Sequence, residues 1–495
     1  MIESTIICLG FTMESIWKKE CQFDVQAPLK NDIKAEVAII GAGMAGILTA
    51  VLLKKKGIDS VVLEANEIAS GQTQNTTAKI TSQHALIYDT LIQKFGKEKA
   101  HLYGMANEAA IKLYSEFMEE GNISCHFERL PSYVYTKNDV SKIEKEVKAA
   151  KACGINAEFT TDTTLPFAIK GAVKFEGQAQ FNPLEFLKEM IKPLKIYEHT
   201  TAEGIEDQVI ITKGGKVKAN AIVVATHYPF INSPGYYFVR MHQERSYAIA
   251  ISNVPELNGM YKDESQSGYS FRNYKDMIIL GGGGHRTGEN TSGGKYESLR
   301  KAAIEYYPES KEICNWSAQD CHSVDSVPYI GQYSASTPQL YVATGFNKWG
   351  MTSAMVSAMI LSDKINGIKN PYEEVFNPQR FEVTASMAGL LDETKHTVNN
   401  LIIKKFKIPD TKLEEVLVGH GAIIEEEGEK VGVYKDLDGL VYMVSTKCTH
   451  LGCQLEWNPD ELSWDCPCHG SRFDYTGKLI NNPALGSLEY EQLNK

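Results

Sequence analysis

Four residues near the C-terminal end of the chain have the types and the spacing of metal ligands. One box contains Cys448-Thr449-His450, and a second contains Cys466-Pro467-Cys468-His469, so each box offers a thiolate and an imidazole. Two Cys and two His also suit a tetrahedral zinc ion, but zinc sites usually pair Cys with Cys and His with His. A [2Fe–2S] cluster in which two His replace two Cys on one iron matches the mixed boxes better. The pattern favours an iron–sulfur cluster, with structural zinc as the alternative.

The two boxes resemble the Rieske iron–sulfur family, and the resemblance extends over residues 413–495. It implies four cluster ligands, which are Cys448, His450, Cys466 and His469. It also implies a disulfide between Cys453 and Cys468 that clamps the two cluster loops. High-potential members follow the second box with Ser-x-Tyr, whereas this chain has Ser471-Arg472-Phe473. Because hydrogen bonds to the cluster sulfurs raise the potential, the missing tyrosine hydroxyl predicts a potential below that of the respiratory type.

A glycine-rich turn near the other end of the chain predicts a second cofactor. Residues 36–40 form an apolar run typical of a buried parallel strand, residues 41–46 open a helix that continues to about Lys56, and residues 60–63 form a second strand. This order, with an acid after the second strand, is the fingerprint of a dinucleotide site: the pyrophosphate binds the helix N-terminus and the acid binds a ribose hydroxyl. The expected binding residues are Gly41, Ala42, Gly43, Met44, Gly46, Glu64 and Ala65. A coincidental match is the alternative, and the fingerprint does not distinguish FAD from NAD.

Three further segments resemble the D-amino-acid oxidase-like flavoenzymes, the family that includes glycine, sarcosine and γ-glutamylputrescine oxidases. The segments are residues 70–79, 316–331 and 340–352, and the resemblance covers residues 35–365. It implies that FAD is the cofactor and that the helix following residue 349 points its N-terminus at the flavin, where negative charge develops. The additional FAD contacts that it implies are Thr76, Thr77, Ala78, Gly331, Gly345, Asn347, Trp349, Gly350, Met351 and Thr352. Some sarcosine oxidases attach flavin through a cysteine at the position of Ala318, so noncovalent FAD is expected here.

These anchors predict the domain organisation. The fold class expected is an α/β FAD-binding Rossmann-like domain with an α+β antiparallel-sheet substrate domain, followed by a small all-β Rieske domain. Residues 1–34 are an N-terminal extension, residues 366–412 a connector with a helix at 385–406, and residues 413–495 the Rieske domain. Within residues 35–365, the FAD-binding pieces are 35–100, 150–232 and 318–365, and the substrate domain takes the segments between them.

Charge and composition restrict the partners. The chain has 495 residues and a net charge of −11, of which −9 falls after residue 412. An acidic C-terminal part argues against nucleic acid and suits either simple solvation or contact with a basic redox partner or with the chain's own flavin domain. No apolar run reaches the ~18 residues of a membrane span, and cysteines outside the boxes are scattered, as in reduced cytoplasmic proteins. We expect a cytoplasmic protein.

The two cofactors together predict an oxidoreductase. The flavoenzyme resemblance implies oxidation of a small amine or amino-acid-like substrate, with electrons passed one at a time between FAD and the cluster and onward to a ferredoxin-like or other redox partner. The alternative is an electron-transfer or redox-sensing protein without small-molecule turnover. Five polar residues are candidates to contact substrate, and each also has an ordinary structural explanation. His242, Tyr247, Arg272 and His285 lie on or beside the predicted roof strands, and Lys348 lies beside the predicted flavin loop.

Overall fold

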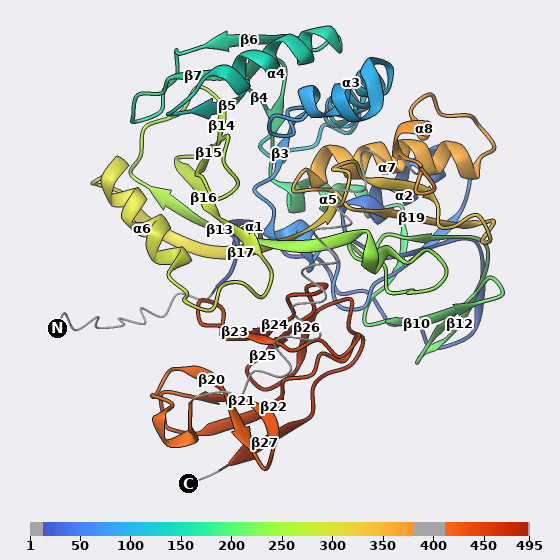
Figure 1. The fold of residues 1–495 in the computed structure, drawn as a ribbon. Helices are drawn as coiled ribbons and strands as arrows, with labels where there is room; N and C mark the ends of the chain where they lie inside the picture. Colours follow the sequence, from blue (N-terminus) through green and yellow to red (C-terminus); the bar gives the residue numbers. More distant parts are fainter. Residues whose placement is uncertain (1–12, 381–410, 494–495) are drawn as a thin grey trace.

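The computed structural model describes residues 13–380 and 411–493. Five sheets account for the strands of these residues (Figure 1): two with eight strands, two with four and one with three. The eight-stranded sheets and most helices belong to residues before 381, whereas both four-stranded sheets belong to residues after 410.

The first eight-stranded sheet has β1 (Ile33–Ile40) at its centre, between β12 (Gly215–Val224) and β2 (Ser60–Leu63). Both pairings are parallel, and Ile40 lies opposite Leu63 on one side and Val224 on the other. The C-terminal halves of β1 and β12 and most of β2 are apolar and buried on both faces, as expected where helices cover a parallel sheet. The remaining strands are β9 (Lys195–Tyr197), β10 (Ala202–Glu206), β11 (Val209–Thr212), β18 (Tyr329–Gln332) and β19 (Leu340–Thr344).

Helices pack on this sheet. α2 (Met44–Lys55) begins directly after β1 and packs against α7 (Gly350–Ile365), which follows β19. α3 (Tyr88–Gly121) extends past residue 100, a predicted domain boundary, and is kinked at Gly96, where the backbone is not helical. The other helices are α1 (Ile16–Glu20), α4 (Ser141–Ala152), α5 (Pro183–Met190), α6 (Lys295–Tyr306) and α8 (Glu373–Phe376), with 3-10 turns η1 (Gln72–Asn75), η2 (Tyr237–Val239) and η4 (Leu413–Glu415).

The second eight-stranded sheet contains the long antiparallel pair β13 (Met241–Ser252) and β17 (Lys311–Ser323), here called the β13–β17 ribbon. His242 lies opposite His322, and Glu244 lies opposite Asp320. Because side chains alternate along a strand, these four residues share one face of the ribbon. The order is β17-β13-β16-β15-β14-β5-β7-β6, with β5 (Ser132–Thr136), β6 (Ala157–Thr160), β7 (Gly171–Phe175), β14 (Met260–Asp263), β15 (Ser270–Tyr274) and β16 (Met277–Arg286). The three-stranded sheet is formed by β3 (Lys79–Ile80), β4 (Glu128–Arg129) and β8 (Ala179–Gln180).

Within residues 411–493, the regular elements of the C-terminal part are strands, apart from η4. Trp464 is fully buried in its core beside the cysteines of the two boxes. One sheet is formed by β20 (Gly421–Glu426), β21 (Glu429–Lys435), β22 (Val441–Ser445) and β27 (Tyr490–Leu493). The other is formed by β23 (Glu456–Asn458), β24 (Ser463–Asp465), β25 (Arg472–Asp474) and β26 (Leu479–Asn481). The sheet that contains β23 to β26 lies next to the ribbon. The sheet that contains β20 to β22 and β27 lies farther from the ribbon (Figure 1).

The predicted helix at 385–406 lies outside the described residues. Residues 13–34 of the N-terminal extension are described. They contact residues 35–365, here called the flavoenzyme-like part, where the fully buried Trp17 donates from Nε1 to the carbonyl of Thr76 at 2.7 Å. Within residues 13–380 and 411–493, none of the helices combines the length and the apolar character needed to cross a bilayer.

Candidate functional site

The dinucleotide turn has the geometry that its glycines predict. Gly41 has φ +109°, and a Cβ there would lie 2.5 Å from the carbonyl oxygen of Ala225. A Cβ on Gly46 would lie 2.0 Å from the carbonyl oxygen of Gly41, so no larger residue fits at either position. Gly43 precedes α2 and provides no side-chain cap. The backbone N–H of Met44 donates to Thr73 Oγ1 at 3.0 Å, and the next N–H groups of the first turn are suited to an anion. The turn is therefore suited to a pyrophosphate.

Glu64 lies beside this turn. Its Oε2 accepts a hydrogen bond from the backbone N–H of Ala42 at 2.8 Å, and its Oε1 accepts one from Asn66 at 2.9 Å. Burial raises the pKa of Glu64. The carboxylate is thus oriented by backbone donors at the position where the fingerprint expects a ribose partner.

Arg272 supports the segment that contains Thr76, Thr77 and Ala78 through hydrogen bonds to its backbone. The guanidinium donates to the carbonyls of Thr77 at 2.8 Å and Ala78 at 2.9 Å, and the side chain is fully buried. Arg272 is one of the candidate substrate contacts. It does not line the polar cavity that contains His242 and His285, and it supports the backbone of a predicted FAD segment.

The loop after β19 leads into α7. Asn347 donates its backbone N–H to the carbonyl of Cys321 at 2.9 Å, while its Oδ1 accepts from the N–H of Ser323 at 2.9 Å. Trp349 precedes α7 without a side-chain cap and stacks on His84, with ring centroids 5.0 Å apart. Gly331 lies within β18, opposite Val342. Two helix starts whose N-cap residues provide no side-chain cap, an oriented acid and glycine turns fit an FAD molecule, which the loops after β1 and β19 would hold.

A polar cavity of about 410 Å³ opens on the ribbon face that carries His242 and Glu244. Lys348 lies beside it, with Nζ 2.7 Å from Glu244 Oε2. Tyr247 stacks on His285 with ring centroids 5.7 Å apart. Two of the five candidate substrate contacts, His242 and His285, thus line the cavity, and Lys348 and Tyr247 each contact a lining residue. The lining residues are His242, Glu244, Gln266, Ser267, Gly284, His285, Arg286 and Glu289.

Glu244 is the centre of charge in the cavity and was missed from the sequence. The Nε2 atoms of His242 and His322 each lie 3.4 Å from one of its oxygens. Burial alone would raise the pKa of Glu244, but His322, His242 and Lys348 outweigh burial and hold the pKa far below its usual range. Asp320, on the same face, has its pKa raised by burial to about 6. Only strand pairing identifies Glu244, Asp320 and His322 as neighbours.

A backbone carbonyl defines the tautomer of the neutral form of His285. Its Nδ1 lies 3.1 Å from the carbonyl of Gly283, to which it donates, so Nε2 carries the free lone pair. Within the described residues, Nε2 is buried and has no hydrogen-bond partner. Burial lowers the pKa of His285. This geometry makes Nε2 a proton acceptor at the cavity wall.

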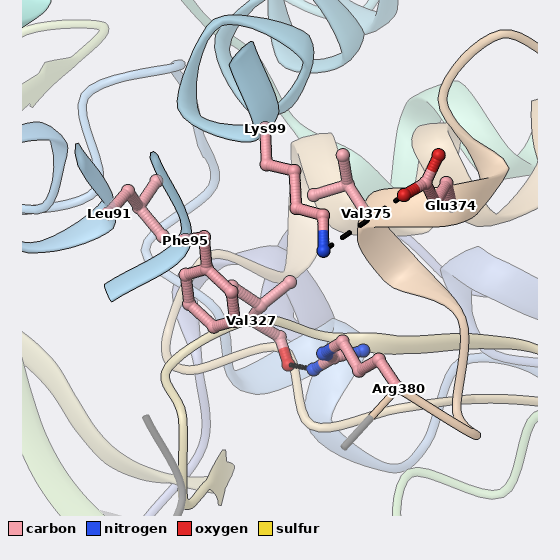
Figure 2. Close-up of a pocket in the computed structure, with 7 residues that line it drawn as sticks. All are labelled: Leu91, Phe95, Lys99, Val327, Glu374, Val375 and Arg380. Atoms are coloured by element: carbon pink, nitrogen blue, oxygen red, sulfur yellow. Dashed lines mark hydrogen bonds and ion pairs between the residues drawn. The ribbon is translucent and has the colours of Figure 1, made fainter. Parts of the chain in front are cut away.

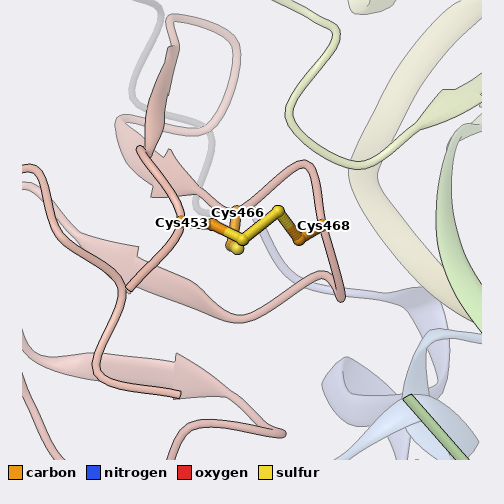
Figure 3. Close-up of side chains that lie close together, drawn as sticks. All are labelled: Cys453, Cys466 and Cys468. Atoms are coloured by element: carbon orange, nitrogen blue, oxygen red, sulfur yellow. A yellow bond between two sulfur atoms is a disulfide. The ribbon is translucent and has the colours of Figure 1, made fainter. Parts of the chain in front are cut away.

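The two cysteine–histidine boxes come together in the C-terminal part. Cys453 and Cys468 form a disulfide, and Cys466 lies beside it (Figure 3). A hydrogen bond from Cys466 lowers the pKa of the buried Cys448 thiol to about 7. Ala484 donates its backbone N–H to Ser471 Oγ at 3.0 Å, whereas the side chain of Phe473 is fully buried without a hydroxyl.

Two histidines complete the donor set. The rings of His450 and His469 lie 5.0 Å apart, and within the described residues Nδ1 of His450 is buried without a hydrogen-bond partner. Two thiols within hydrogen-bonding distance and two adjacent imidazoles fit a [2Fe–2S] cluster held by Cys448, Cys466 and the two histidines.

The earlier part of the chain contacts both boxes. His450 Nε2 donates to Asn232 Oδ1 at 3.0 Å, and the ring of Phe238 lies edge-on to both His450 and His469 at 6.5 and 5.9 Å. Gln243 donates to the carbonyl of His469 at 2.7 Å. The cluster boxes are therefore docked on the flavoenzyme-like part.

A second, much smaller pocket lies between α3, α8 and the segment before β18 (Figure 2). Its volume is about 10 Å³, room for about one water molecule. Arg380 spans it and forms a buried ion pair with Asp325 at 2.9 Å. The pocket is too small for an amine substrate.

Comparisons with known proteins agree with this geometry. Residues 36–364 match the family described as FAD dependent oxidoreductase, and residues 408–491 match the Rieske [2Fe-2S] domain. The Rieske 2Fe-2S iron-sulfur protein YhfW of Bacillus subtilis (strain 168) is 36% identical over 97% of this chain and 98% of its own length.

Two solved structures share the fold of the flavoenzyme-like part. Glycine oxidase from Geobacillus kaustophilus aligns with a TM-score of 0.61 at 17% identity, over 70% of this chain and 99% of that one. L-Proline dehydrogenase from P. horikoshii aligns with a TM-score of 0.58 at 19% identity, over 72% and 98% of the two chains. At these identities the likeness is one of fold alone.

Proposed function

The chain belongs to the FAD dependent oxidoreductase family and carries a C-terminal Rieske [2Fe-2S] domain, and from this premise we propose that it oxidises a small amine or amino-acid-like substrate. When bound, FAD supplies a two-electron hydride acceptor and the cluster a one-electron exchange centre. We propose further that electrons pass one at a time between these two centres within one chain.

The observation that carries the proposal is the position of the β13–β17 ribbon. One of its faces presents His242 and Glu244 to the polar cavity, and the opposite face presents Gln243 to the backbone of His469. A single layer of backbone thus separates the candidate substrate cavity from the second cluster box. This arrangement suits a short internal route for electrons.

The cavity residues have separate tasks in this proposal. A hydride leaves an amine readily only when the nitrogen lone pair is free, so His285 Nε2 accepts the proton of the substrate ammonium. Tyr247 holds the His285 ring by stacking. Lys348 and Glu244 form a fixed ion pair that orients the polar groups of the substrate. A zwitterionic amino acid would find a positive charge on Lys348 for its carboxylate and a negative charge on Glu244 for its ammonium group.

Anaerobic titration with a panel of amines and amino acids tests the proposal, with flavin absorbance and the cluster EPR signal followed together. We expect at least one substrate to bleach the flavin and then to reduce the cluster. Reduction of the flavin with a cluster that stays oxidised would rule out internal transfer. Reduction by NAD(P)H or a ferredoxin system, and by no amine, would favour the carrier function instead.

We also propose a ferredoxin-like or other one-electron protein as the external redox partner, since a hydride delivers two electrons and the cluster holds one. A cytoplasmic location is proposed as well. It is supported by the buried thiols of Cys21, Cys125, Cys153, Cys314 and Cys321, none of which is in a disulfide.

A further inference from the structure

We propose that Gln243 and Gln319, a buried pair on the ribbon, form the bridge through which electrons pass between the flavin loops and the second cluster box. This inference rests on the proposed function and specifies its route. Both side chains are buried, with exposures of 2% and 0%. They lie on the ribbon face opposite to the cavity, since Gln243 pairs with Cys321 and Arg245 pairs with Gln319.

One arm of the bridge starts at the loop after β19. Asn347 donates its backbone N–H to the carbonyl of Cys321 at 2.9 Å. The thiol of Cys321 lies 3.6 Å from Gln243 Oε1, and Gln243 Nε2 donates to the carbonyl of His469 at 2.7 Å. This arm joins a predicted FAD residue to a predicted cluster ligand through covalent bonds and short contacts only.

The other arm starts at the first FAD segment. Gln319 donates its backbone N–H to Gln72 Oε1 at 2.7 Å, and its Nε2 donates to the carbonyl of Gly470 at 2.8 Å. The two arms are linked, because Gln319 Nε2 also donates to Gln243 Oε1 at 2.7 Å. Each glutamine amide is therefore held in one orientation by several partners.

Gly470 allows the box to approach this closely. It has φ +81°, and a Cβ at this position would lie 2.6 Å from Gln243 Cβ. The backbone of the second box thus rests directly on the glutamine pair. Arg286 and Asn482 add contacts at the edges, where Arg286 donates to the carbonyl of Pro467 at 3.4 Å and Gln243 donates to that of Asn482 at 3.2 Å.

The step that this bridge serves moves one electron and breaks no bond. One electron would pass from reduced FAD to the oxidised cluster, and a one-electron carrier protein would have to reoxidise the cluster before the second electron followed. Electronic coupling falls more slowly through covalent and hydrogen bonds than across van der Waals gaps. Replacing either amide by an apolar chain of similar length opens such a gap and leaves a buried carbonyl without a donor.

The test uses the holoprotein and needs no substrate. Flavin is reduced anaerobically by light and an external photoreductant, and electron arrival at the cluster is followed by absorbance and by EPR. The variants are Gln243→Met and Gln319→Met, with Gln332→Met on β18 as the matched control. We expect transfer to slow by roughly tenfold or more in the two bridge variants, the size of effect common for residues that support metal ligands, and to stay unchanged in the control.

FAD and iron contents show whether each variant is loaded, and Gln319→Asn replaces Gln319→Met if that variant does not fold. In Gln243→Met the EPR signal of the reduced cluster should also shift, because the backbone carbonyl of His469 loses the hydrogen bond from Gln243 Nε2. Equal transfer rates in wild type and both bridge variants would overturn the bridge and leave the proposed function standing. Absence of transfer in the wild type would overturn both the bridge and the proposed internal electron transfer.

Discussion

The histidines of the cluster boxes are oriented by residues far away in sequence. His450 Nε2 donates to Asn232 at 3.0 Å, which leaves Nδ1 as the atom available to a metal. In the cavity, the backbone carbonyl of Gly283 likewise determines the tautomer of His285. At this scale, single hydrogen bonds determine which nitrogen can react or ligate.

Replacement of Cys466 tests the cluster ligands. Cys466→Ser should remove iron and acid-labile sulfide while FAD remains bound, because the predicted ligands lie in a separate part of the chain. Cys314→Ser is the matched control, as Cys314 is equally buried and lies on β17 away from the boxes. Metal and sulfide assays on purified protein provide the measurement. Zinc without sulfide in the wild type would contradict the cluster.

Replacement of His285 tests the proton acceptor. Burial lowers the pKa of His285, so the neutral form persists below its usual value of about 6.5, and flavin reduction by a productive amine should lose rate only below that pH. His285→Gln should slow flavin reduction by about 10² or more and remove this acid limb, as expected for loss of a general base. Stopped-flow absorbance against pH measures both effects.

Tyr247→Phe is the control for His285→Gln, because it keeps the stacked ring and removes only the hydroxyl. It should reduce flavin at nearly the wild-type rate. An unchanged pH profile in His285→Gln would rule out His285 as the proton acceptor.

At the scale of elements, the loop between β23 and β24 fastens the C-terminal part to the ribbon. Glu461 accepts from Arg245 and from Arg472, and all three side chains are at least nine-tenths buried. Asp460 accepts the backbone N–H groups of Gly294 at 3.0 Å and Lys295 at 2.9 Å, so it caps α6 from another domain. Acidic residues of the C-terminal part thus serve contact with its own chain, whereas those of the β20–β21 hairpin are exposed.

Glu461 makes this attachment pH-dependent. Burial alone would raise the pKa of Glu461, but Arg245 and Arg472 outweigh burial and hold the pKa at about 2. A carboxyl with a folded-state pKa below its unfolded value stabilises the protein in full above about 4.5 and loses that contribution as the pH falls toward about 2. Glu461→Gln should cost about 3–5 kcal/mol at neutral pH, since it leaves buried guanidinium groups without a charged partner.

Thermal unfolding between pH 3 and pH 7 measures this contribution. The gap in stability between wild type and Glu461→Gln should narrow as the pH falls through the range from about 4.5 to about 2. The exposed pair Lys447 and Glu429 offers a control, and Glu429→Gln should change stability by less than about 1 kcal/mol. A gap that does not depend on pH would contradict the role of Glu461.

At the scale of the molecule, the two cofactor parts form one structural unit across a buried polar interface. Arg245, Gln243 and Asn290 on one side bond to Glu461, His469 and Asp460 on the other. The C-terminal part is therefore held on the flavoenzyme-like part by these direct contacts, in addition to the connector that links the two parts in sequence.

Removal of iron tests whether the flavoenzyme-like part and the C-terminal part unfold together. Chelation under reducing conditions should lower the melting temperature of the whole chain, because a group that binds only the folded state stabilises it by mass action. The flavin fluorescence transition should shift together with the C-terminal transition. Flavin release at the same temperature with and without iron would show that the two parts unfold independently.

Much of the fold was predictable, because its signals are local. The turn at Gly41 and the two cluster boxes depend on residues close together in sequence, and family membership and the Cys453–Cys468 disulfide agree with that prediction. The roles of individual ligands and FAD contacts stay predictions. For Arg272, the sequence indicated only a polar residue on a predicted roof strand, and the tertiary structure adds that it supports the backbone of Thr77 and Ala78.

The sequence by itself determined the two cofactor types, because ligand spacing and glycine turns are local requirements. Only the tertiary structure decided what lies between them. Pairing of β13 with β17 places Glu244 beside His322 on one face and Gln243 beside Gln319 on the other, across a long separation in sequence. Strand register is set by packing of the whole sheet, and a shift of one residue would exchange the two faces. The relation between cavity and cluster boxes is therefore a property of the folded chain.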